Sequence, residues 1–230
     1  MLKILIVAAT VQESAFLISK KSKKSTSQLI PITVNKSIQV DLLITGPGVV
    51  ATTFGMTKTL ENNDYQLAIN IGICGSLDKT MRPVKLINIV SDQFGDFGIE
   101  DNNEFIPAFS TGLFPKQSGI HSKGVLKSTN KLNISSLKAI PKRNGITVQK
   151  VHGSTKSARE AYNRYGPVME SMEGAAFFYV ANQYQIPSLQ IRAISNMVEK
   201  RNRKAWKVED AIDALAGYVS LLLLDLQSLK

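Results

Sequence analysis

Cysteine, histidine and tryptophan are scarce in this sequence of 230 residues, which contains one cysteine, two histidines and one tryptophan. The single cysteine, Cys74, excludes an internal disulfide framework, so we expect a reduced, cytoplasmic protein. The histidines, His121 and His152, lack the spacing of a metal site, and we expect each to make ordinary hydrogen bonds in the core or at the surface. We therefore expect neither a metal nor a cofactor.

Long hydrophobic runs are also missing. The apolar N-terminal stretch Leu2 to Ala8 is too short to span a bilayer and precedes no small-residue cleavage pattern. A second run, Leu221 to Leu224, lies in a C-terminal segment patterned with aspartates, which is typical of the buried face of a terminal helix. We expect no membrane partner.

Acidic residues are the minority charge, with 18 Asp and Glu against 28 Lys and Arg and a formal net charge of +10. Such an excess can mark a nucleic-acid partner or an anionic ligand. The basic clusters, Lys20 to Lys24 and Glu199 to Lys204, lack the interleaved aromatic residues of a platform that stacks single-stranded bases. We expect no nucleic-acid partner, although a nucleic-acid-binding module stays an alternative.

The hydrophobic residues, 43% of the chain, form short apolar runs that alternate with segments of helical spacing. A chain of this length can bury a substantial core, and we expect one domain over residues 1–230. The pattern predicts a three-layer α/β sandwich in which helices flank a central mixed β-sheet. Strands are predicted at Leu2 to Ala8, Leu29 to Val34, Ile38 to Thr45, Leu67 to Ile73, Lys85 to Ser91, Ser118 to Leu126, Gly145 to His152 and Ser188 to Ile194. Helices are predicted at Val11 to Ile18, Val49 to Leu60, Glu160 to Tyr165, Met169 to Tyr184 and Lys207 to Leu229.

Polar groups or glycines follow three of the predicted strands. Glu13 comes just after the first strand, a turn from Gly72 to Gly75 ends the fourth, and Ser195 and Asn196 end the last. Because parallel strands bring their carboxyl ends to one rim, we expect a ligand site there. The segment Asp92 to Phe114 reads as a long irregular loop and is a candidate wall of the pocket.

Two carboxylates, Glu170 and Glu173, open the helix predicted from Met169. Carboxylates are favoured at a helix N-terminus by the unpaired N–H groups and the dipole, even where they have no function. Glu173 is followed by Gly174 and two alanines, so little bulk surrounds it. This suits either close helix packing or a carboxylate that reaches a ligand hydroxyl.

Four segments together resemble one family. They are AATVQE at residues 8–13, NIGICGSL at 70–77, ESMEGAAFFYV at 170–180 and IRAISNMVEKRNRKAW at 191–206. In this order they resemble the nucleoside phosphorylase and nucleosidase superfamily, and within it most the futalosine hydrolases, which release hypoxanthine from futalosine in menaquinone biosynthesis. The resemblance implies a nucleoside phosphorylase-like fold, a small nucleoside substrate and a homo-oligomer.

The resemblance also implies roles for individual residues. Glu13 is similar to the general base that activates the attacking water, and Arg192 to the arginine near that water, although a strand-end ion pair would also explain an arginine there. Glu173 is similar to the carboxylate that binds the ribose hydroxyls, with Met172 packed against the sugar. The other expected substrate-binding residues are Gly72, Ile73, Gly75, Ser195, Arg201 and Trp206. Ile73 departs from the family, whose adenine-releasing members usually carry a small hydroxyl residue there that helps to hold the water. The resemblance therefore implies that Glu13 and Arg192 hold the attacking water.

Asn196 bears on the choice of base, because the methylthioadenosine nucleosidases of this superfamily carry an aspartic acid at the matching position. An asparagine cannot serve as that acid, but its oxygen can accept from a purine N7–H while its nitrogen donates to O6 of a 6-oxopurine. An ionised aspartate would face the O6 lone pairs, a mismatch of about 1–3 kcal/mol once buried. Asn196 therefore favours hypoxanthine over adenine as the leaving base.

Arg201 and Trp206 offer a cation and a stacking surface for the carboxylated aromatic end of futalosine. A solvated loop is the alternative for these residues. Hydrolysis is favoured over phosphorolysis, since no Gly-Asp-Pro-x-Arg type of phosphate motif appears near the N-terminus. The alternatives in function are a methylthioadenosine or adenosylhomocysteine nucleosidase, an inosine-type purine nucleoside phosphorylase, and a non-catalytic nucleotide- or nucleic-acid-binding module.

Overall fold

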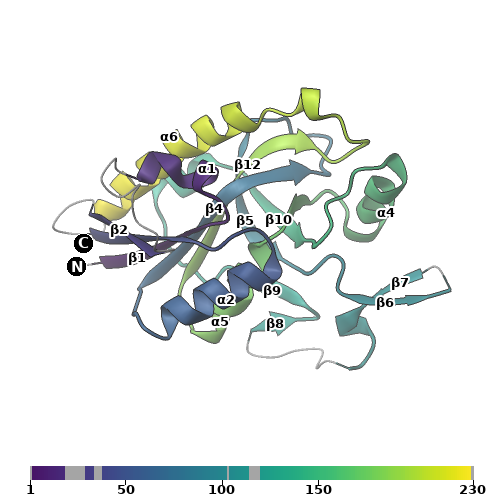
Figure 1. The fold of residues 1–230 in the computed structure, drawn as a ribbon, viewed down its shortest axis with the longest axis horizontal. Helices are drawn as coiled ribbons and strands as arrows, with labels where there is room; N and C mark the ends of the chain where they lie inside the picture. Colours follow the sequence, from purple (N-terminus) through teal and green to yellow (C-terminus); the bar gives the residue numbers. More distant parts are fainter. Residues whose placement is uncertain (1, 19–28, 34–37, 103, 114–119, 229–230) are drawn as a thin grey trace.

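The computed structural model describes residues 2–18, 29–33, 38–102, 104–113 and 120–228 (Figure 1). Outside these residues lie the basic cluster Lys20 to Lys24 and the ends of three predicted elements, at Val34, Ser118 and Leu229. The strands are β1 Leu2–Ala8, β2 Leu29–Thr33, β3 Ile38–Ile44, β4 Leu67–Ser76, β5 Leu86–Asp92, β6 Gly98–Asp101, β7 Glu104–Pro107, β8 His121–Ser122, β9 Val125–Lys127, β10 Lys142–Thr147, β11 Met169–Ser171 and β12 Ser188–Met197. The α-helices are α1 Val11–Ser14, α2 Val49–Leu60, α3 Ser135–Ala139, α4 Thr155–Tyr165, α5 Gly174–Gln183 and α6 Val208–Gln227.

The central sheet is mixed and runs in the order β2-β3-β1-β4-β11-β10-β5-β9-β8, with β12 paired to both β4 and β5. Strand β1 pairs in parallel with β3 and β4, and β12 pairs in parallel with β4. The carboxyl ends of β1, β4 and β12 therefore lie at one rim, as predicted. Strand β11 joins the end of β4 antiparallel.

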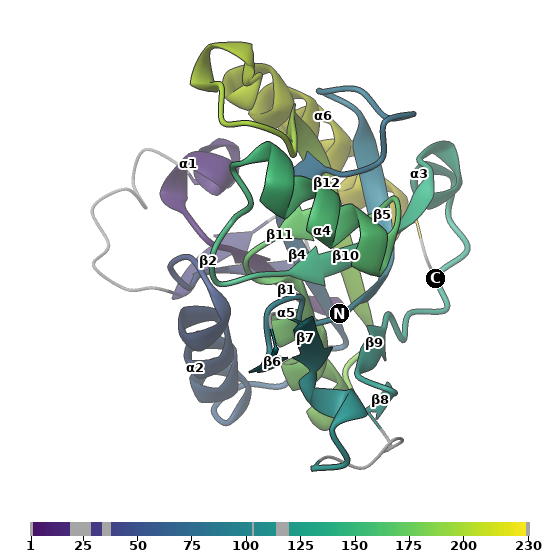
Figure 2. The same ribbon diagram turned by 90° about the vertical axis from the view of Figure 1, so that its right-hand side faces the viewer.

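Helices cover both faces of the sheet, which confirms the predicted three-layer sandwich (Figures 1 and 2). Alternate residues of β1 enter different cores because side chains alternate between the two faces of a strand. Ile4 and Ile6 pack in the core under α6, whereas Leu5 and Val7 pack in the core with α2 and α5. No helix in the described part of the chain combines the length and apolar character that crossing a membrane requires.

The glycine stretch at residues 72–75 is not a turn, and the prediction was wrong here. Strand β4 continues to Ser76 and stays paired with β12 as far as the Met197 to Ser76 pair. Neither Gly72 nor Gly75 has a positive φ. Because they lack a side chain, neighbouring groups can lie close to their backbone. The glycines therefore correctly predicted a close approach to the backbone but wrongly predicted a turn of the chain.

The helix predicted from Met169 was also wrong at its start. Met169–Ser171 form the short strand β11 between β10 and β4, and helix α5 begins only at Gly174, with Glu173 as its N-cap residue. Glu170 therefore lies on a strand. The predicted irregular segment from Asp92 contains the β6–β7 hairpin, and none of the residues described in this segment lines the cavity described next.

Candidate active site

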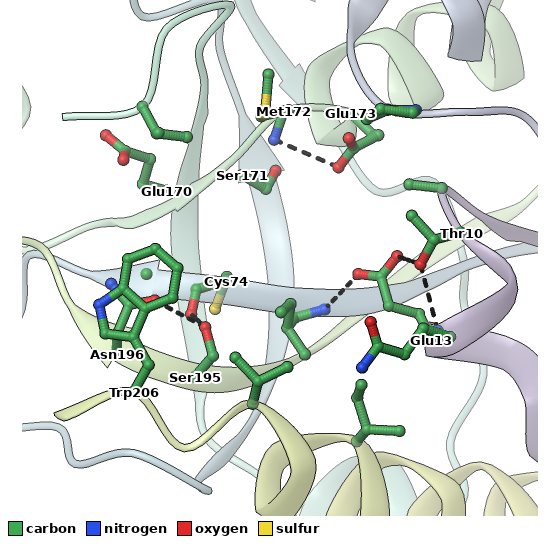
Figure 3. Close-up of a pocket in the computed structure, with 18 of the residues that line it drawn as sticks. Thr10, Glu13, Cys74, Glu170, Ser171, Met172, Glu173, Ser195, Asn196 and Trp206 are labelled. Carbon is green, nitrogen blue, oxygen red and sulfur yellow. Dashed lines mark hydrogen bonds between the residues drawn. The ribbon is translucent and has the colours of Figure 1, made fainter. Parts of the chain in front are cut away.

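A cavity of about 300 Å³ lies at the rim where β1, β4 and β12 end (Figure 3). Nine of the predicted site residues line it: Glu13, Ile73, Gly75, Met172, Glu173, Ser195, Asn196, Arg201 and Trp206. Gly72 and Arg192 do not line the cavity and lie behind its wall. Segments far apart in the sequence therefore meet in one place, as the converging strand ends predicted.

Glu13 is fixed from two sides. Its Oε1 accepts a hydrogen bond from the Ile73 N–H at 3.0 Å, and its Oε2 accepts one from the Thr10 hydroxyl at 2.9 Å. Thr10 is also the N-cap of α1, because its hydroxyl oxygen accepts from the Glu13 N–H. The sequence did carry a signal for Thr10, since a threonine three residues before a glutamate is the spacing of a capping box.

Glu173 lies at the N-terminus of α5, and two backbone N–H groups hold its side chain. Its Oε1 accepts from the Gly48 N–H at 3.0 Å, and its Oε2 accepts from the Met172 N–H at 3.3 Å. Gly48 adopts a φ of 93°, a left-handed conformation that favours glycine. Burial raises the pKa of Glu173, while the Arg192 guanidinium and the Gly48 N–H oppose part of that shift.

Arg192 is a buried cation beneath this carboxylate, with a relative exposure of 1%. Its Nε donates to Gln190 Oε1 at 3.1 Å, its Nη2 donates to Asn70 Oδ1, and Nη2 lies 3.9 Å from Glu173 Oε2. Its Nη1 has no hydrogen-bond partner among the described residues. The ion-pair alternative thus accounts for Nη2 but not for Nη1.

Gly72 separates Arg192 from Glu13. A Cβ at position 72 would lie 2.3 Å from Arg192 Nη1 and 2.8 Å from Glu13 Oε1, both far inside normal contact distance. The two side chains therefore approach each other over a position that only glycine leaves open.

We expect Gly72→Ala to lower kcat/KM about 10- to 100-fold, because overpacking of this kind costs about 1–3 kcal/mol and would displace both side chains. Gly217→Ala is the matched control, since a Cβ there on α6 meets nothing within 4 Å. Steady-state kinetics of the two variants provide the test. Equal activity of both would show that Glu13 and Arg192 do not need this close approach.

Asn196 has an amide whose orientation is fixed by its neighbours. Its Nδ2 donates to the Met197 carbonyl at 2.9 Å, and its Oδ1 accepts from the Ser195 hydroxyl at 2.8 Å. A carbonyl can only accept, so the nitrogen must be the end that faces Met197. One lone pair on Oδ1 and one N–H on Nδ2 remain for a ligand.

His152 and Glu170 form a pair in the cavity wall that the sequence prediction missed. Glu170 Oε1 accepts a hydrogen bond from the backbone N–H of His152 at 3.1 Å, and Glu170 Oε2 contacts the ring nitrogen Nδ1 of His152. The two side chains are 17% and 4% exposed. The sequence analysis set His152 aside because it lacks the spacing of a metal site, and nothing in the spacing linked it to Glu170.

Arg201 and Trp206 also meet in the cavity wall. The Arg201 guanidinium lies 4.9 Å from the centre of the Trp206 ring, a cation–π contact. Val208 and Ile212 of α6 extend this side of the cavity. The pair is therefore part of the site wall, although Arg201 itself is largely exposed.

A buried carboxyl, Asp92, supports the site from behind. It accepts hydrogen bonds from the Thr147 hydroxyl at 2.9 Å and from Gln190 Nε2 at 3.2 Å. The Thr147 oxygen in turn accepts the Ala175 N–H in the first turn of α5, and Gln190 binds Arg192. Burial raises the pKa of Asp92 to about 7, with the bonds from Gln190 and Thr147 acting in the opposite direction.

This raised pKa predicts a pH-dependent stability. Below pH about 4 the carboxyl is protonated in both states, but as pH rises the unfolded chain ionises first, so stability falls until pH exceeds about 7. As pH rises from 5 to 8, ionisation of Asp92 should therefore lower the free energy of unfolding by roughly 2–3 kcal/mol. Urea unfolding of Asp92→Asn should show a correspondingly flatter profile than the wild type. Asp213→Asn, on an exposed position of α6, is the control, and an unchanged slope in Asp92→Asn would contradict the assignment.

No group of three or more His, Cys, Asp or Glu side chains within the described ranges is arranged to hold a metal ion. Cys74 is buried, and burial raises the pKa of its thiol to about 12, so the thiol stays protonated at neutral pH. The polar side chains that line the cavity include Glu13, Glu173, Asn196 and the Glu170–His152 pair.

Comparisons with known proteins show the family of the chain. A family model described as "Phosphorylase superfamily" matches residues 3–224. The chain is 28% identical over 185 residues to a futalosine hydrolase of Acidothermus cellulolyticus, covering 79% of this chain and 74% of the relative. It is 24% identical over 189 residues to a futalosine hydrolase of Thermus thermophilus, covering 79% and 80%.

Solved structures share the fold. The chain is similar to a 5′-methylthioadenosine/S-adenosylhomocysteine nucleosidase of Helicobacter pylori in complex with butyl-thio-DADMe-Immucillin-A, with a TM-score of 0.78, 17% identity and coverage of 97% and 98%. It is also similar to a futalosine hydrolase of Helicobacter pylori, with a TM-score of 0.77, 16% identity and coverage of 96% and 97%. At these identities the structures establish the fold, and the predicted fold class is confirmed.

Proposed function

Because the chain belongs to the phosphorylase superfamily, we propose that it is a hydrolytic nucleosidase that cleaves the N-glycosidic bond of futalosine and releases hypoxanthine and dehypoxanthine futalosine. The observation that carries the proposal is the oriented amide of Asn196, which offers one acceptor and one donor to a base. The relatives named futalosine hydrolase support the same substrate.

Glu13 is the general base in this proposal. Its two oxygens are oriented by Ile73 and Thr10, and each keeps a lone pair for the attacking water. Arg192 Nη1 lies behind the cavity wall, on the other side of the position that Gly72 leaves open, where its positive charge faces the Glu13 carboxylate. The backbone N–H of Ile73 orients Glu13, so the missing hydroxyl side chain at this position does not leave the base unsupported.

Glu173 and Met172 hold the ribose. A carboxylate that accepts from two sugar hydroxyls forms charge-assisted bonds, which are stronger than neutral ones. As the N-glycosidic bond stretches, positive charge builds on the sugar, and Glu13 and Glu173 stabilise it electrostatically. Negative charge accumulates on the leaving purine, where the remaining Asn196 N–H donates to O6.

The Arg201–Trp206 pair is proposed to bind the carboxylated aromatic end of the substrate, through the exposed cation and the indole face. We also propose that residues 1–230 form one domain and that the chain forms a homo-oligomer. Val50 and Phe54, one turn apart on α2, are 74% and 65% exposed, and an apolar face of this kind supports a protein contact.

The experiment that tests the function is incubation with futalosine, inosine or methylthioadenosine, with and without phosphate, followed by identification of the free base. The proposal expects hypoxanthine from futalosine without phosphate. Adenine from methylthioadenosine would identify the other nucleosidase class, and phosphate dependence a phosphorylase. Steeply salt-dependent nucleic-acid binding without base release would instead indicate a binding module.

Asn196→Asp should weaken turnover of a 6-oxopurine nucleoside about 5- to 100-fold, because an ionised carboxylate would face both the Met197 carbonyl and O6. Asn163→Asp on the exposed surface of α4 introduces the same charge away from the cavity and serves as the control. The readout is the ratio of kcat/KM values for futalosine and its 6-amino analogue. A ratio that does not change would count against the amide argument.

A further inference from the structure

The cavity wall contains a second polar element besides Asn196. Glu170 pairs with Gly75 across β11 and β4, and Asn196 pairs with the same Gly75 across β12 and β4. The three residues thus form one row across three neighbouring strands, and both side chains line the same cavity (Figure 3). Adjacent strands are about 4.8 Å apart, so the backbones of Glu170 and Asn196 are separated by about 10 Å.

Gly75 forms the floor between these two side chains. A Cβ there would lie 2.6 Å from Val198 Cγ2 and 3.5 Å from Asn196 Nδ2. Glu13, by contrast, is bound to Ile73, two residues earlier along β4. The sugar-cleaving carboxylate and the Glu170 row therefore occupy successive positions along one strand, which places the row at the end of the cavity where the base would lie.

Glu170 and His152 both line this space. The carboxylate receives the His152 N–H on Oε1 and contacts Nδ1 through Oε2, and each oxygen retains a further lone pair. Contact with a carboxylate places the ring proton on Nδ1. His152 thus orients Glu170, whose side chain is only 4% exposed and is aimed by two contacts.

We propose that Glu170 is a specificity-determining residue that accepts the N1–H of a 6-oxopurine, with His152 as its positioning residue. This inference rests on the proposed function and deepens it. A 6-oxopurine carries a hydrogen on N1, next to the O6 that Asn196 would bind, whereas adenine carries a lone pair on N1. A buried carboxylate facing that lone pair repels adenine, so the base is selected at two neighbouring atoms by residues of two different strands.

The test measures equilibrium binding of free bases by calorimetry and so does not depend on catalysis. Wild-type protein should bind hypoxanthine at least about 10-fold more tightly than 1-methylhypoxanthine, which lacks the N1–H. It should bind 9-methylhypoxanthine nearly as well as hypoxanthine, because that methyl group points along the glycosidic bond toward the sugar site. Equal affinity for hypoxanthine and 1-methylhypoxanthine would overturn the inference.

Glu170→Gln separates charge from shape, because glutamine has nearly the same size. Its preference for hypoxanthine over adenine should fall about 10-fold or more relative to wild type. Glu160→Gln, whose carboxylate makes an exposed contact with Lys156, is the matched control and should keep the wild-type preference. If Glu170→Gln melts at the wild-type temperature and keeps the preference as well, Glu170 does not read N1.

The two proposals can fail separately. Release of hypoxanthine from futalosine together with indifference to the N1 methyl group would overturn this inference and leave the proposed function standing. Selective binding of hypoxanthine through its N1–H, without cleavage of futalosine, would support the base-reading role of Glu170 and overturn the proposed hydrolase.

Discussion

Replacing Glu13 by glutamine is expected to lower turnover about 10²- to 10⁴-fold, the usual contribution of a positioned general base. Glutamine keeps the size of the side chain and can still accept from the Ile73 N–H, while the Thr10 hydroxyl can turn to accept from the new amide. The geometry should therefore survive while the capacity to take a proton from water is lost.

The measurement is kcat for base release under saturating substrate, with the melting temperature as a check on folding. Glu160→Gln is again a suitable control, because it removes one carboxylate from the exposed surface of α4. A Glu13→Gln enzyme with near-normal turnover would remove Glu13 from the role of base.

The second large effect is expected for Glu173→Gln, which should lower kcat/KM about 10- to 1,000-fold. Hydrogen bonds to a charged group contribute about 1.5–3 kcal/mol each, against about 1 kcal/mol for neutral ones, and this carboxylate is proposed to make two. The variant also leaves the buried Arg192 guanidinium without its carboxylate 3.9 Å away, which should reduce stability as well as activity.

A substrate without the 2′-hydroxyl distinguishes the binding role of Glu173 from a structural one. If Glu173 binds that hydroxyl, the wild type should discriminate against the 2′-deoxy substrate and Glu173→Gln should lose most of that discrimination. A variant that is merely misfolded would lose activity on both substrates equally. Undiminished discrimination would contradict the assignment.

Much of the fold could be predicted from hydrophobic pattern. The apolar runs at Leu2 to Ala8 and Leu67 to Ile73 are buried on both faces of the sheet, and helix α2 begins and ends as the spacing predicted. These elements are long enough for their periodicity to be read. Strand β11 has only three residues, which is too short for any period, and the prediction merged it with the helix that follows.

The site was predictable only where each residue carries its own chemical signal. Glu13, Glu173 and Asn196 are polar groups next to buried elements, and the structure places all three on the cavity. Their supporting contacts are non-local: Gly48 and Glu173 are 125 residues apart, and Arg192 and Asn70 are 122 apart. Such pairs leave no trace in local spacing, because they arise only when the strands assemble.

Selection of the base by Asn196 and Glu170 is tested most directly by one comparison. The kcat/KM for futalosine is compared with that for its 6-amino analogue, both measured in phosphate-free buffer by the appearance of free base. The two substrates differ only at the atoms that Asn196 and Glu170 are proposed to read. Two discriminating contacts of about 1–3 kcal/mol each predict a preference for futalosine of at least about 30-fold. Equal values, a preference for the amino compound, or no hypoxanthine release without phosphate would contradict it.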